Sequence, residues 1–289
     1  MSSAAHFRNL IESGKLVMAP GAPDSLTARL TEQAGFPAVY MTGFGATASR
    51  LGMPDIGLLT QTEMTEQARN MTRAVDIPVI ADADTGYGGP SNIHRTVLEY
   101  QQAGVAAIHL EDQVAPKRCG QMAGIALITP EQAARTISLA CQARDNSPFG
   151  RALTVIARTD ALPAAGMDEA LARVQRYRDA GADMVFVDGV KTISEVEAIA
   201  RAVSGPKVVS LVDGTEASAL NKTQLEQMGF QLALYAVTTL FAAASAAQSA
   251  LAELARRGGA NPNPPMSYAG FCEVVDLPFH QRLDDQSSA

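Results

Sequence analysis

The sequence predicts an α/β protein with a (β/α)8 barrel of the TIM type, followed by an extended C-terminal helical tail. Three observations predict it: short apolar runs alternate with longer helical patterns, eight such runs occur, and several helical patterns end in Ala-Gly or Met-Gly before the next run. Nearly continuous apolar runs separated by helices are typical of a parallel sheet covered by helices. Eight repeats of this unit match a closed barrel.

The eight expected strands are spread over the first 240 residues. They span residues 15–20, 38–43, 78–84, 106–112, 153–160, 183–189, 207–214 and 232–237. Glycine at a helix end accepts the left-handed conformation that stops the helix, which explains the recurring glycine steps. After the eighth strand a helical stretch reaches Arg257, and Gly, Asn and Pro dominate residues 258–265. We therefore expect a catalytic barrel at residues 1–257 and a hinge with a helical tail, delivered to a neighbouring subunit, at residues 258–289.

The composition of the chain excludes several classes of function. The chain of 289 residues has a formal net charge of -7, which leaves no basic face for a nucleic-acid backbone. We find no apolar stretch suited to a signal peptide or a membrane span, so we expect a cytoplasmic protein without a membrane partner. Three scattered cysteines argue against a disulfide framework and fit a reducing compartment.

Carboxylates gather where the third and fourth expected strands end. Asp82 and Asp84 end the third run, and Glu111 lies at the end of the fourth. The carboxyl-terminal ends of the strands carry the chemistry in barrel enzymes. Carboxylates without His or Cys beside them form a hard oxygen site suited to Mg2+ or Mn2+. The alternative is that these residues are surface carboxylates solvated by water.

A flexible loop follows and contains the sequence KRCGQ at residues 117–121. The flanking cations, Lys117 among them, would favour the thiolate of Cys119, as a nucleophilic or proton-donating cysteine requires. The alternative is a cysteine packed beneath a surface loop. Cys141 and Cys272 lie in apolar surroundings, and we interpret both as structural.

Two features suit a substrate carboxylate. Arg158 closes the fifth run, where its planar guanidinium can hold a carboxylate at two points. The alternative for Arg158 is a salt bridge to Asp82 or Glu111. The segment Thr42-Gly43-Phe44-Gly45, at the end of the second run, offers backbone amides to an anion.

Together these motifs resemble the isocitrate lyase and phosphoenolpyruvate mutase superfamily. The resemblance rests on the runs PGAPDSLTARLTEQAGFPAVYMTG, LGMPDIG, IADADTGYGG, HLEDQVAPKRCG and IARTDAL. It is strongest to the branch of methylisocitrate lyase, dimethylmalate lyase and carboxyphosphonoenolpyruvate mutase, and it runs from about Pro20 to the eighth expected strand. It implies a Mg2+-dependent barrel and a homotetramer whose subunits exchange a C-terminal helix, which suits the hinge.

The resemblance also implies roles at the metal site. Asp82 would bind Mg2+ directly, Asp84 and Glu111 would hold its water ligands, and Asp55 of the LGMPD run would support the site. Mn2+ is the alternative ion. Tyr87 follows the metal motif closely in sequence and is a candidate for the base that takes the proton of a 2-hydroxyl group.

The resemblance implies a substrate-binding role for Arg158, acting with the amides around Thr42, Gly43 and Phe44 on the 1-carboxylate. Cys119 corresponds to the lyase cysteine, carried with Lys117 on a loop that closes over the substrate. Members that cleave C–C bonds carry this cysteine, and phosphoenolpyruvate mutase itself lacks it.

The sequence departs from the family pattern at the positions that would bind the far end of the substrate. After Gly120 the lyases have His and this chain has Gln121; the sixth strand usually ends in Glu-Ala and here carries Asp188. The seventh strand usually carries Asn and here carries Ser210. We count Gly120, Gln121, Asp188 and Ser210 among the expected substrate-binding residues.

The resulting hypothesis is a Mg2+-dependent carbon–carbon lyase that cleaves the C2–C3 bond of a small 2-hydroxy di- or tricarboxylic acid and releases a 2-oxo acid such as pyruvate. Carboxyphosphonoenolpyruvate phosphonomutase or oxaloacetate hydrolase or decarboxylase activity is the alternative within the same family. A non-catalytic metabolite-binding protein is the alternative from another class.

Overall fold

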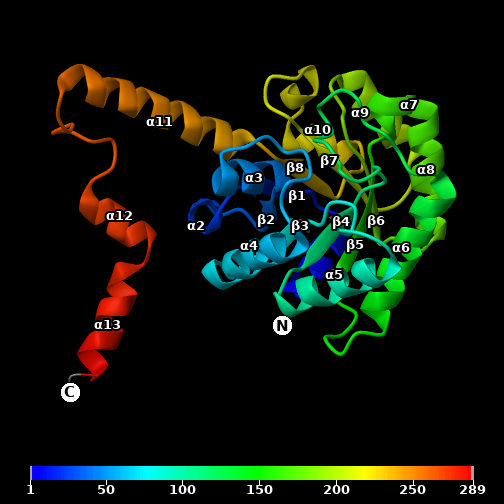
Figure 1. Cartoon of the computed structure of the whole chain (residues 1–289), viewed down its shortest axis with the longest axis horizontal. Helices are drawn as coiled ribbons and strands as arrows, with labels where there is room; N and C mark the ends of the chain where they lie inside the picture. The colour runs from blue at the N-terminus through cyan, green and yellow to red at the C-terminus, as the bar shows by residue number, and fades with distance from the viewer. Residues whose placement is uncertain (1, 288–289) are drawn as a thin grey trace. The chain divides into compact units, whose positions relative to one another are not determined.

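The computed structural model describes residues 2–287 and contains a closed barrel of eight parallel strands in sequence order, each paired with the next and β8 with β1 (Figure 1). The strands are β1 Val17–Ala22, β2 Val39–Met41, β3 Val79–Asp82, β4 Ala107–Leu110, β5 Thr154–Thr159, β6 Met184–Val187, β7 Lys207–Ser210 and β8 Leu232–Tyr235. The barrel prediction is confirmed. Seven of the strands are shorter than the expected runs because the polar residues at the end of most runs lie in the loops that follow, whereas β1 has the expected length and begins two residues later.

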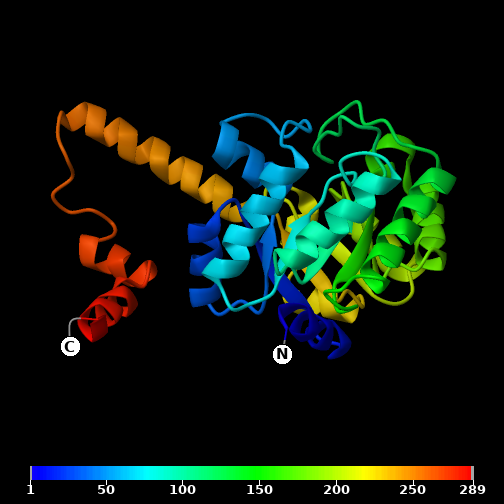
Figure 2. The same ribbon diagram turned by 60° about the horizontal axis from the view of Figure 1, so that its bottom comes forward.

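Helices surround the barrel on the outside, as Figures 1 and 2 show. They are α1 Ser3–Glu12, α2 Ser25–Gln33, α3 Gly43–Leu51, α4 Gln61–Ala74, α5 Pro90–Gln102, α6 Pro130–Asp145, α7 Ala161–Ala165, α8 Met167–Asp179, α9 Ile193–Ala202, the 3-10 helix η1 Glu216–Ala219 and α10 Lys222–Gln227. The glycines of the four Ala-Gly or Met-Gly steps all have positive φ, which confirms that they end the helices before them.

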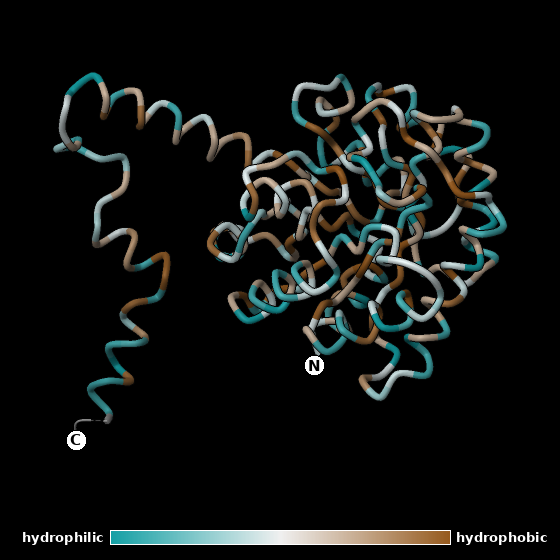
Figure 3. Tube along the Cα trace, in the orientation of Figure 1, coloured by the Kyte–Doolittle hydropathy of each residue, from teal (hydrophilic) through white to brown (hydrophobic). Residues whose placement is uncertain are grey.

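Two apolar layers hold the barrel together. An inner cluster fills the barrel with side chains of alternate strand residues, such as Ile80, Ile156 and Phe186, and includes Phe7 of α1. A larger outer cluster lies between the strands and the surrounding helices. In Figure 3 the hydrophobic stretches of the tube run through the strands, whereas the helices alternate between hydrophobic and hydrophilic residues. This alternation is what a helix with one face on a sheet requires.

Contacts divide the chain into two units, residues 1–239 and 240–289. The second unit contains nearly all of α11 Thr238–Arg257, together with α12 Tyr268–Val274 and α13 Leu277–Ser287. The expected boundary at residue 257 lies at the end of α11, and the assignment of catalysis to residues 1–257 stays a prediction. Among the described residues, no helix is both long and apolar enough to span a membrane.

Candidate active site

The polar residues expected at the strand ends meet at one end of the barrel and are buried there. Asp82 is the last residue of β3, Glu111 directly follows β4 and Arg158 is the next-to-last residue of β5. Asp188 follows β6, and Ser210 ends β7. Each of the five is at most 7% exposed, which excludes the alternative of solvated surface carboxylates.

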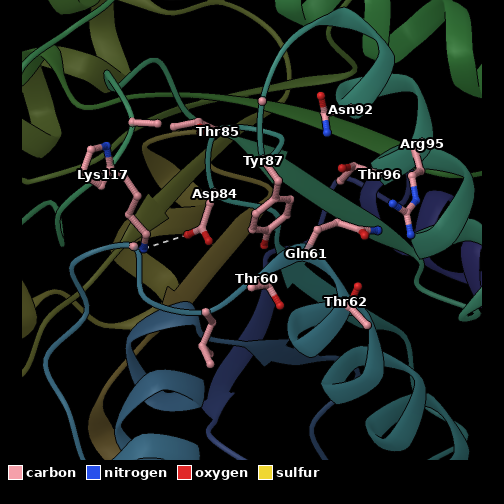
Figure 4. Close-up of a pocket in the computed structure, with 15 residues that line it drawn as sticks. Thr60, Gln61, Thr62, Asp84, Thr85, Tyr87, Asn92, Arg95, Thr96 and Lys117 are labelled. Atoms are coloured by element: carbon pink, nitrogen blue, oxygen red, sulfur yellow. Dashed lines mark ion pairs between the residues drawn. The ribbon is translucent and has the colours of Figure 1, made fainter.

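Lys117 joins the loop after β4 to the carboxylates. Its Nζ lies 2.7 Å from Oδ1 of Asp55 and 2.8 Å from Oδ1 of Asp84, an ion pair drawn in Figure 4. Burial alone would lower the pKa of Lys117, but the surrounding carboxylates, Asp84 first among them, raise it well above its ordinary value. Lys117 is therefore a permanent cation that faces the expected metal ligands.

Arg158 is held by three carboxylates. Its Nη2 lies 2.6 Å from Oδ2 of Asp188 and 2.8 Å from Oδ1 of Asp160, and its Nε lies 3.3 Å from Oε2 of Glu111. Its guanidinium also lies 5.5 Å from the centre of the Phe186 ring, a cation–π distance. The alternative of a salt bridge to Glu111 is thus confirmed. Nη1 makes no hydrogen bond or ion pair within residues 2–287, so it remains available to a ligand.

The network contains more carboxylates than cations. Six buried carboxylates accompany Lys117 and Arg158, a formal excess of four negative charges; they are Asp55, Asp82, Asp84, Glu111, Asp160 and Asp188. Burial raises the pKa of Glu111 well above its ordinary value and that of Asp84 to about 6, against the opposing cations. A buried group of this kind is stabilised by a bound cation.

Asp82 is the carboxylate that stays ionised. Burial would raise its pKa, but the charges of His109, Lys117 and Arg158 lower it to about 2. Burial lowers the pKa of His109 itself to about 4. His109 is therefore neutral at pH 7, where Asp82 is already ionised and Lys117 and Arg158 are the neighbouring cations.

These residues fit a hydrated hard cation. Both carboxylate oxygens of Glu111 are buried and accept no hydrogen bond from the residues that the structure describes, although Oε2 lies 3.3 Å from Nε of Arg158. In residues 2–287 no three His, Cys, Asp or Glu side chains converge closely enough to chelate an ion directly. Both observations agree with the arrangement that the resemblance implies. In that arrangement one carboxylate binds the ion directly, and water lies between the ion and the other carboxylates.

The absence of a side chain at Gly43 leaves space next to Oδ2 of Asp82. A Cβ atom at position 43 would lie 2.5 Å from Oδ2 of Asp82, so only glycine fits there. Gly43 and Phe44 begin α3, where the first backbone N–H groups have no partner within the helix. The hydroxyl of buried Thr42 caps this helix by accepting from the backbone N–H of Gly45. The expected anion-binding amides therefore lie beside the carboxylate site.

The loop that carries Cys119 lies directly on the Arg158–Asp188 pair. A Cβ atom at Gly120 would be 2.2 Å from Oδ2 of Asp188 and 2.9 Å from Nη2 of Arg158. The backbone N–H of Cys119 donates to the carbonyl of Asp55 at 3.1 Å. Gln121 follows, half-buried, on the same loop. The loop thus covers the end of the barrel at which the charged residues meet.

The expectation that flanking cations favour the thiolate of Cys119 is wrong. Burial, reinforced by the charge of Asp188, raises the pKa of Cys119 to about 11. Lys117 does not reverse this shift because its ammonium group faces Asp55 and Asp84. Cys119 is a neutral thiol at pH 7, which suits a proton donor better than a nucleophile.

Tyr87 does not fit the role of base. It lines a cavity of about 590 Å³ beside the site, together with Asp84, Lys117 and the first residues of α4 (Figure 4). Its hydroxyl lies 3.2 Å from the hydroxyl of Tyr100. Burial and the charge of Asp84 raise its pKa well above the ordinary value, so the phenol stays protonated at neutral pH.

Sequence reasoning missed three supporting residues. Gln113 holds the loop by accepting from the backbone N–H of Arg118 at 2.9 Å and donating to its carbonyl at 2.8 Å. His109 lies inside the barrel with its Nε2 2.9 Å from the hydroxyl of Tyr40. The signal for His109 and Tyr40 was their place within apolar strands, where a polar side chain needs a partner.

Buried charged groups at the carboxyl-terminal strand ends of a closed parallel barrel place this chain among the (β/α)8-barrel enzymes. Comparison with known proteins then gives the family. The family model for phosphoenolpyruvate phosphomutase matches residues 7–255, and the chain belongs to this family.

Relatives with known names include lyases. A 2,3-dimethylmalate lyase from Eubacterium barkeri is 43% identical over 246 residues, which are 85% of this chain and 84% of that protein. A 2-methylisocitrate lyase from Aeropyrum pernix is 39% identical over 251 residues, which are 87% of this chain and 79% of that protein. A solved oxaloacetate acetylhydrolase, in complex with 3,3-difluorooxalacetate, matches with a TM-score of 0.93 and 32% identity, covering 100% of this chain and 98% of that one. The expected superfamily and enzyme class are confirmed.

Proposed function

We propose that this protein is a Mg2+-dependent lyase that cleaves the C2–C3 bond of a small 2-hydroxy dicarboxylic acid of the 2,3-dimethylmalate type. The observation that carries the proposal is the neutral Cys119 thiol on a loop that rests on the Arg158–Asp188 pair. A proton donor at this point can serve a carbanion formed next to a carboxylate that Arg158 holds. The 43% identity to a 2,3-dimethylmalate lyase supports the same reaction.

The residues divide the work. Nη1 of Arg158 and the first amides of α3 bind and orient the 1-carboxylate of the substrate. The loop at residues 113–127 excludes water. The 2-hydroxyl gives its proton to a base, the C2–C3 bond breaks with its electron pair on C3, and the thiol of Cys119 protonates C3. The proton taken from the 2-hydroxyl balances the one given to C3, and its return to the sulfur restores the thiol. The products are a 2-oxo acid and a second carboxylic acid.

Asp82 would hold Mg2+ directly, Asp84 and Glu111 would hold it through water, and Asp55 would support the site. When bound, the ion supplies positive charge that stabilises the negative charge developing on the substrate oxygen. Mn2+ offers the same oxygen preference and would substitute.

Hydrolysis of oxaloacetate is the second candidate, because the oxaloacetate acetylhydrolase shares the fold over nearly its whole length. A hydrolase needs a water that adds to the C2 carbonyl carbon before the C2–C3 bond breaks, and C3 is then protonated as in a lyase.

We also propose a homotetramer in the cytoplasm. Exposed large apolar side chains recur along the second unit and would become buried against another subunit; they are Phe241, Leu251, Leu254, Met266, Tyr268, Phe271, Val275, Leu277, Phe279 and Leu283. The three free cysteines fit a reducing compartment.

A substrate panel tests the proposed reaction. Purified protein with Mg2+ is given 2-hydroxy and 2-oxo di- and tricarboxylates, and pyruvate, glyoxylate, oxalate and acetate are quantified. We expect pyruvate from 2,3-dimethylmalate. Oxalate and acetate from oxaloacetate, without cleavage of any 2-hydroxy acid, would establish the hydrolase instead.

A further inference from the structure

Three buried polar side chains line up inside the barrel beneath the carboxylate site. Asp82 of β3 and His109 of β4 are register partners on neighbouring strands, and Tyr40 of β2 is the partner of Ile80. Because residues two apart in a strand share a face, Ile80 and Asp82 point the same way, and Tyr40 and His109 lie beside them. His109 is fully buried and Tyr40 is 4% exposed, so water does not compete for their hydrogen bonds.

His109 lies between the other two. Its Nε2 is 2.9 Å from the hydroxyl of Tyr40, and its Nδ1 is 3.6 Å from Oδ1 of Asp82. Within the described residues Nδ1 has no hydrogen-bond partner, although it is completely buried. The imidazole is held between the rings of Tyr40 and Phe186, with ring centres 5.6 Å and 5.9 Å away. Nδ1 therefore faces Asp82 and cannot turn to another acceptor without repacking the barrel.

Electrostatics selects one tautomer of this imidazole. With the proton on Nδ1, the N–H points at the Asp82 carboxylate and Nε2 accepts from the Tyr40 hydroxyl. In the other tautomer the Nδ1 lone pair would face the carboxylate oxygen, which is repulsive in a buried site. The Tyr40 hydroxyl favours the first tautomer because a phenol donates readily to an imidazole nitrogen.

The two oxygens of Asp82 have different surroundings. Oδ1 faces His109 and accepts from the backbone N–H of Asp84 at 3.0 Å. Oδ2 faces the gap that Gly43 leaves. A carboxylate held through one oxygen presents the other in a fixed direction.

We propose that His109 and Tyr40 are positioning residues that orient Asp82 for its cation. Tyr40 fixes the His109 tautomer, the Nδ1–H of His109 attracts Oδ1 of Asp82, and Oδ2 is left to bind the ion. Such partners behind a metal ligand tune affinity and are worth about 10- to 100-fold in metal binding. The inference rests on the proposed metal site and goes beyond it by naming the residues that set its affinity.

Titration of the full-length protein with Mn2+, without substrate and with free Mn2+ measured by EPR, tests the proposal. Tyr40→Phe keeps the ring and removes the hydroxyl, and we expect the Kd to rise about 10-fold. His109→Leu removes both nitrogens, and the Kd should rise by about 10- to 100-fold. His109→Asn places an amide N–H near the position of Nδ1 and should restore most of the affinity that His109→Leu loses.

Tyr177→Phe is the matched control, because Tyr177 also donates from a buried hydroxyl to a carboxylate, Asp112, at 2.6 Å. It should lower the melting temperature and leave the Kd for Mn2+ unchanged. Melting curves establish that each variant is folded, and Tyr40→Phe decides the question if His109→Leu does not fold. A Kd for Tyr40→Phe within about twofold of the parent value would overturn the proposal and leave the lyase function standing. A parent protein that binds no Mn2+ would remove the metal site and this inference together.

Discussion

Burial decides the charge of the titratable side chains in this site. Loss of water raises the pKa of Glu111, lowers that of His109 to about 4 and raises that of Cys119 to about 11. In each case the uncharged form is favoured. Asp82 is an exception, because the charges of His109, Lys117 and Arg158 lower its pKa to about 2 despite its burial. A proton donor and an ionised metal ligand can therefore coexist in one small volume.

Replacing Cys119 by alanine should lower kcat by about 10²-fold or more, the usual scale for a lost general acid. The fold should be intact, because the thiol is only partly buried on a loop. Steady-state kinetics with 2,3-dimethylmalate measure the loss. Cys141→Ala is the control: this thiol donates to the carbonyl of Gly181 in the outer layer, so its loss should affect stability and not kcat. Near-parental turnover by Cys119→Ala would exclude the thiol as the acid.

The raised pKa of Cys119 also predicts how alkylation depends on pH. Only the thiolate reacts, so the rate of labelling by iodoacetamide should be slow at pH 7 and rise about tenfold per pH unit toward pH 11. Because the folded-state pKa lies above the unfolded value near 9, this group stabilises the fold below about pH 9 and loses that contribution as pH rises through 11. Peptide mapping of labelled Cys119 gives the rates. A plateau below pH 9 would contradict the pKa shift.

At the scale of elements, the loop at residues 113–127 is fixed at several separate points. Gln113 bonds the backbone of Arg118, Lys117 pairs with Asp55 and Asp84, and Cys119 donates to the Asp55 carbonyl. The backbone of Gln113 also pairs with that of Leu127. The loop closes the barrel only if its backbone can come very near the Arg158–Asp188 pair.

Gly120→Ala should therefore lower kcat/KM by at least about tenfold while leaving the melting temperature nearly unchanged. The added Cβ would collide with the side chains of Asp188 and Arg158, so the loop could not pack against this pair. The loop would then exclude water from the site less well. Gly124→Ala is a control on the same loop: its Cβ would have ordinary contacts, although its positive φ adds local strain. Equal losses in both variants would mean that the close approach of the backbone at Gly120 is not what limits turnover.

At the scale of the whole molecule, the barrel concentrates negative charge at one end. Six carboxylates and two cations in a buried volume are stable together only with further positive charge or with protons on some of the acids. The raised pKa values of Asp84, Glu111 and Asp188 correspond to protons on some of the acids. A hard divalent ion would supply the further positive charge instead.

EDTA should abolish turnover, and Mg2+ or Mn2+ should restore it, since the available donors are oxygens. The melting temperature should rise when the ion is added, because an ion that binds only the folded state stabilises it. Activity assays and thermal melts in chelated buffer measure both effects. Full activity in metal-free buffer would end the metal hypothesis.

The preferred substrate should be a dicarboxylate of the 2,3-dimethylmalate type and not 2-methylisocitrate. A third carboxylate needs dedicated donors, and we expect Gln121 and Ser210, which stand where the resemblance implies His and Asn, to supply them less well. An unpaired anion in a closed site costs several kcal/mol, or about 10²-fold in kcat/KM. Because the chain is also 39% identical to a 2-methylisocitrate lyase, measuring the turnover of 2-methylisocitrate is a strict test of this prediction. Faster turnover of 2-methylisocitrate would show that these substitutions do not control specificity.

The sequence by itself determined the barrel, the order of its strands and the residues at their carboxyl ends. Apolar runs at regular intervals leave few other folds, and the polar residues that close these runs, such as Asp82 and Arg158, have to meet at one end of a parallel barrel. The short motifs around Asp84 and Cys119 also determined the family, which the matching family model confirms.

Only the tertiary structure decided which charges meet. Lys117 lies two residues before Cys119 in sequence but its side chain pairs with Asp55 and Asp84, so the thiol stays neutral. Tyr87 follows the metal motif, but its hydroxyl lies within hydrogen-bond distance of the hydroxyl of Tyr100. The partnership of Tyr40, His109 and Asp82 joins three different strands. The physical reason is that pKa values and hydrogen bonds depend on distance and burial in space, and neither quantity can be read from spacing along the chain.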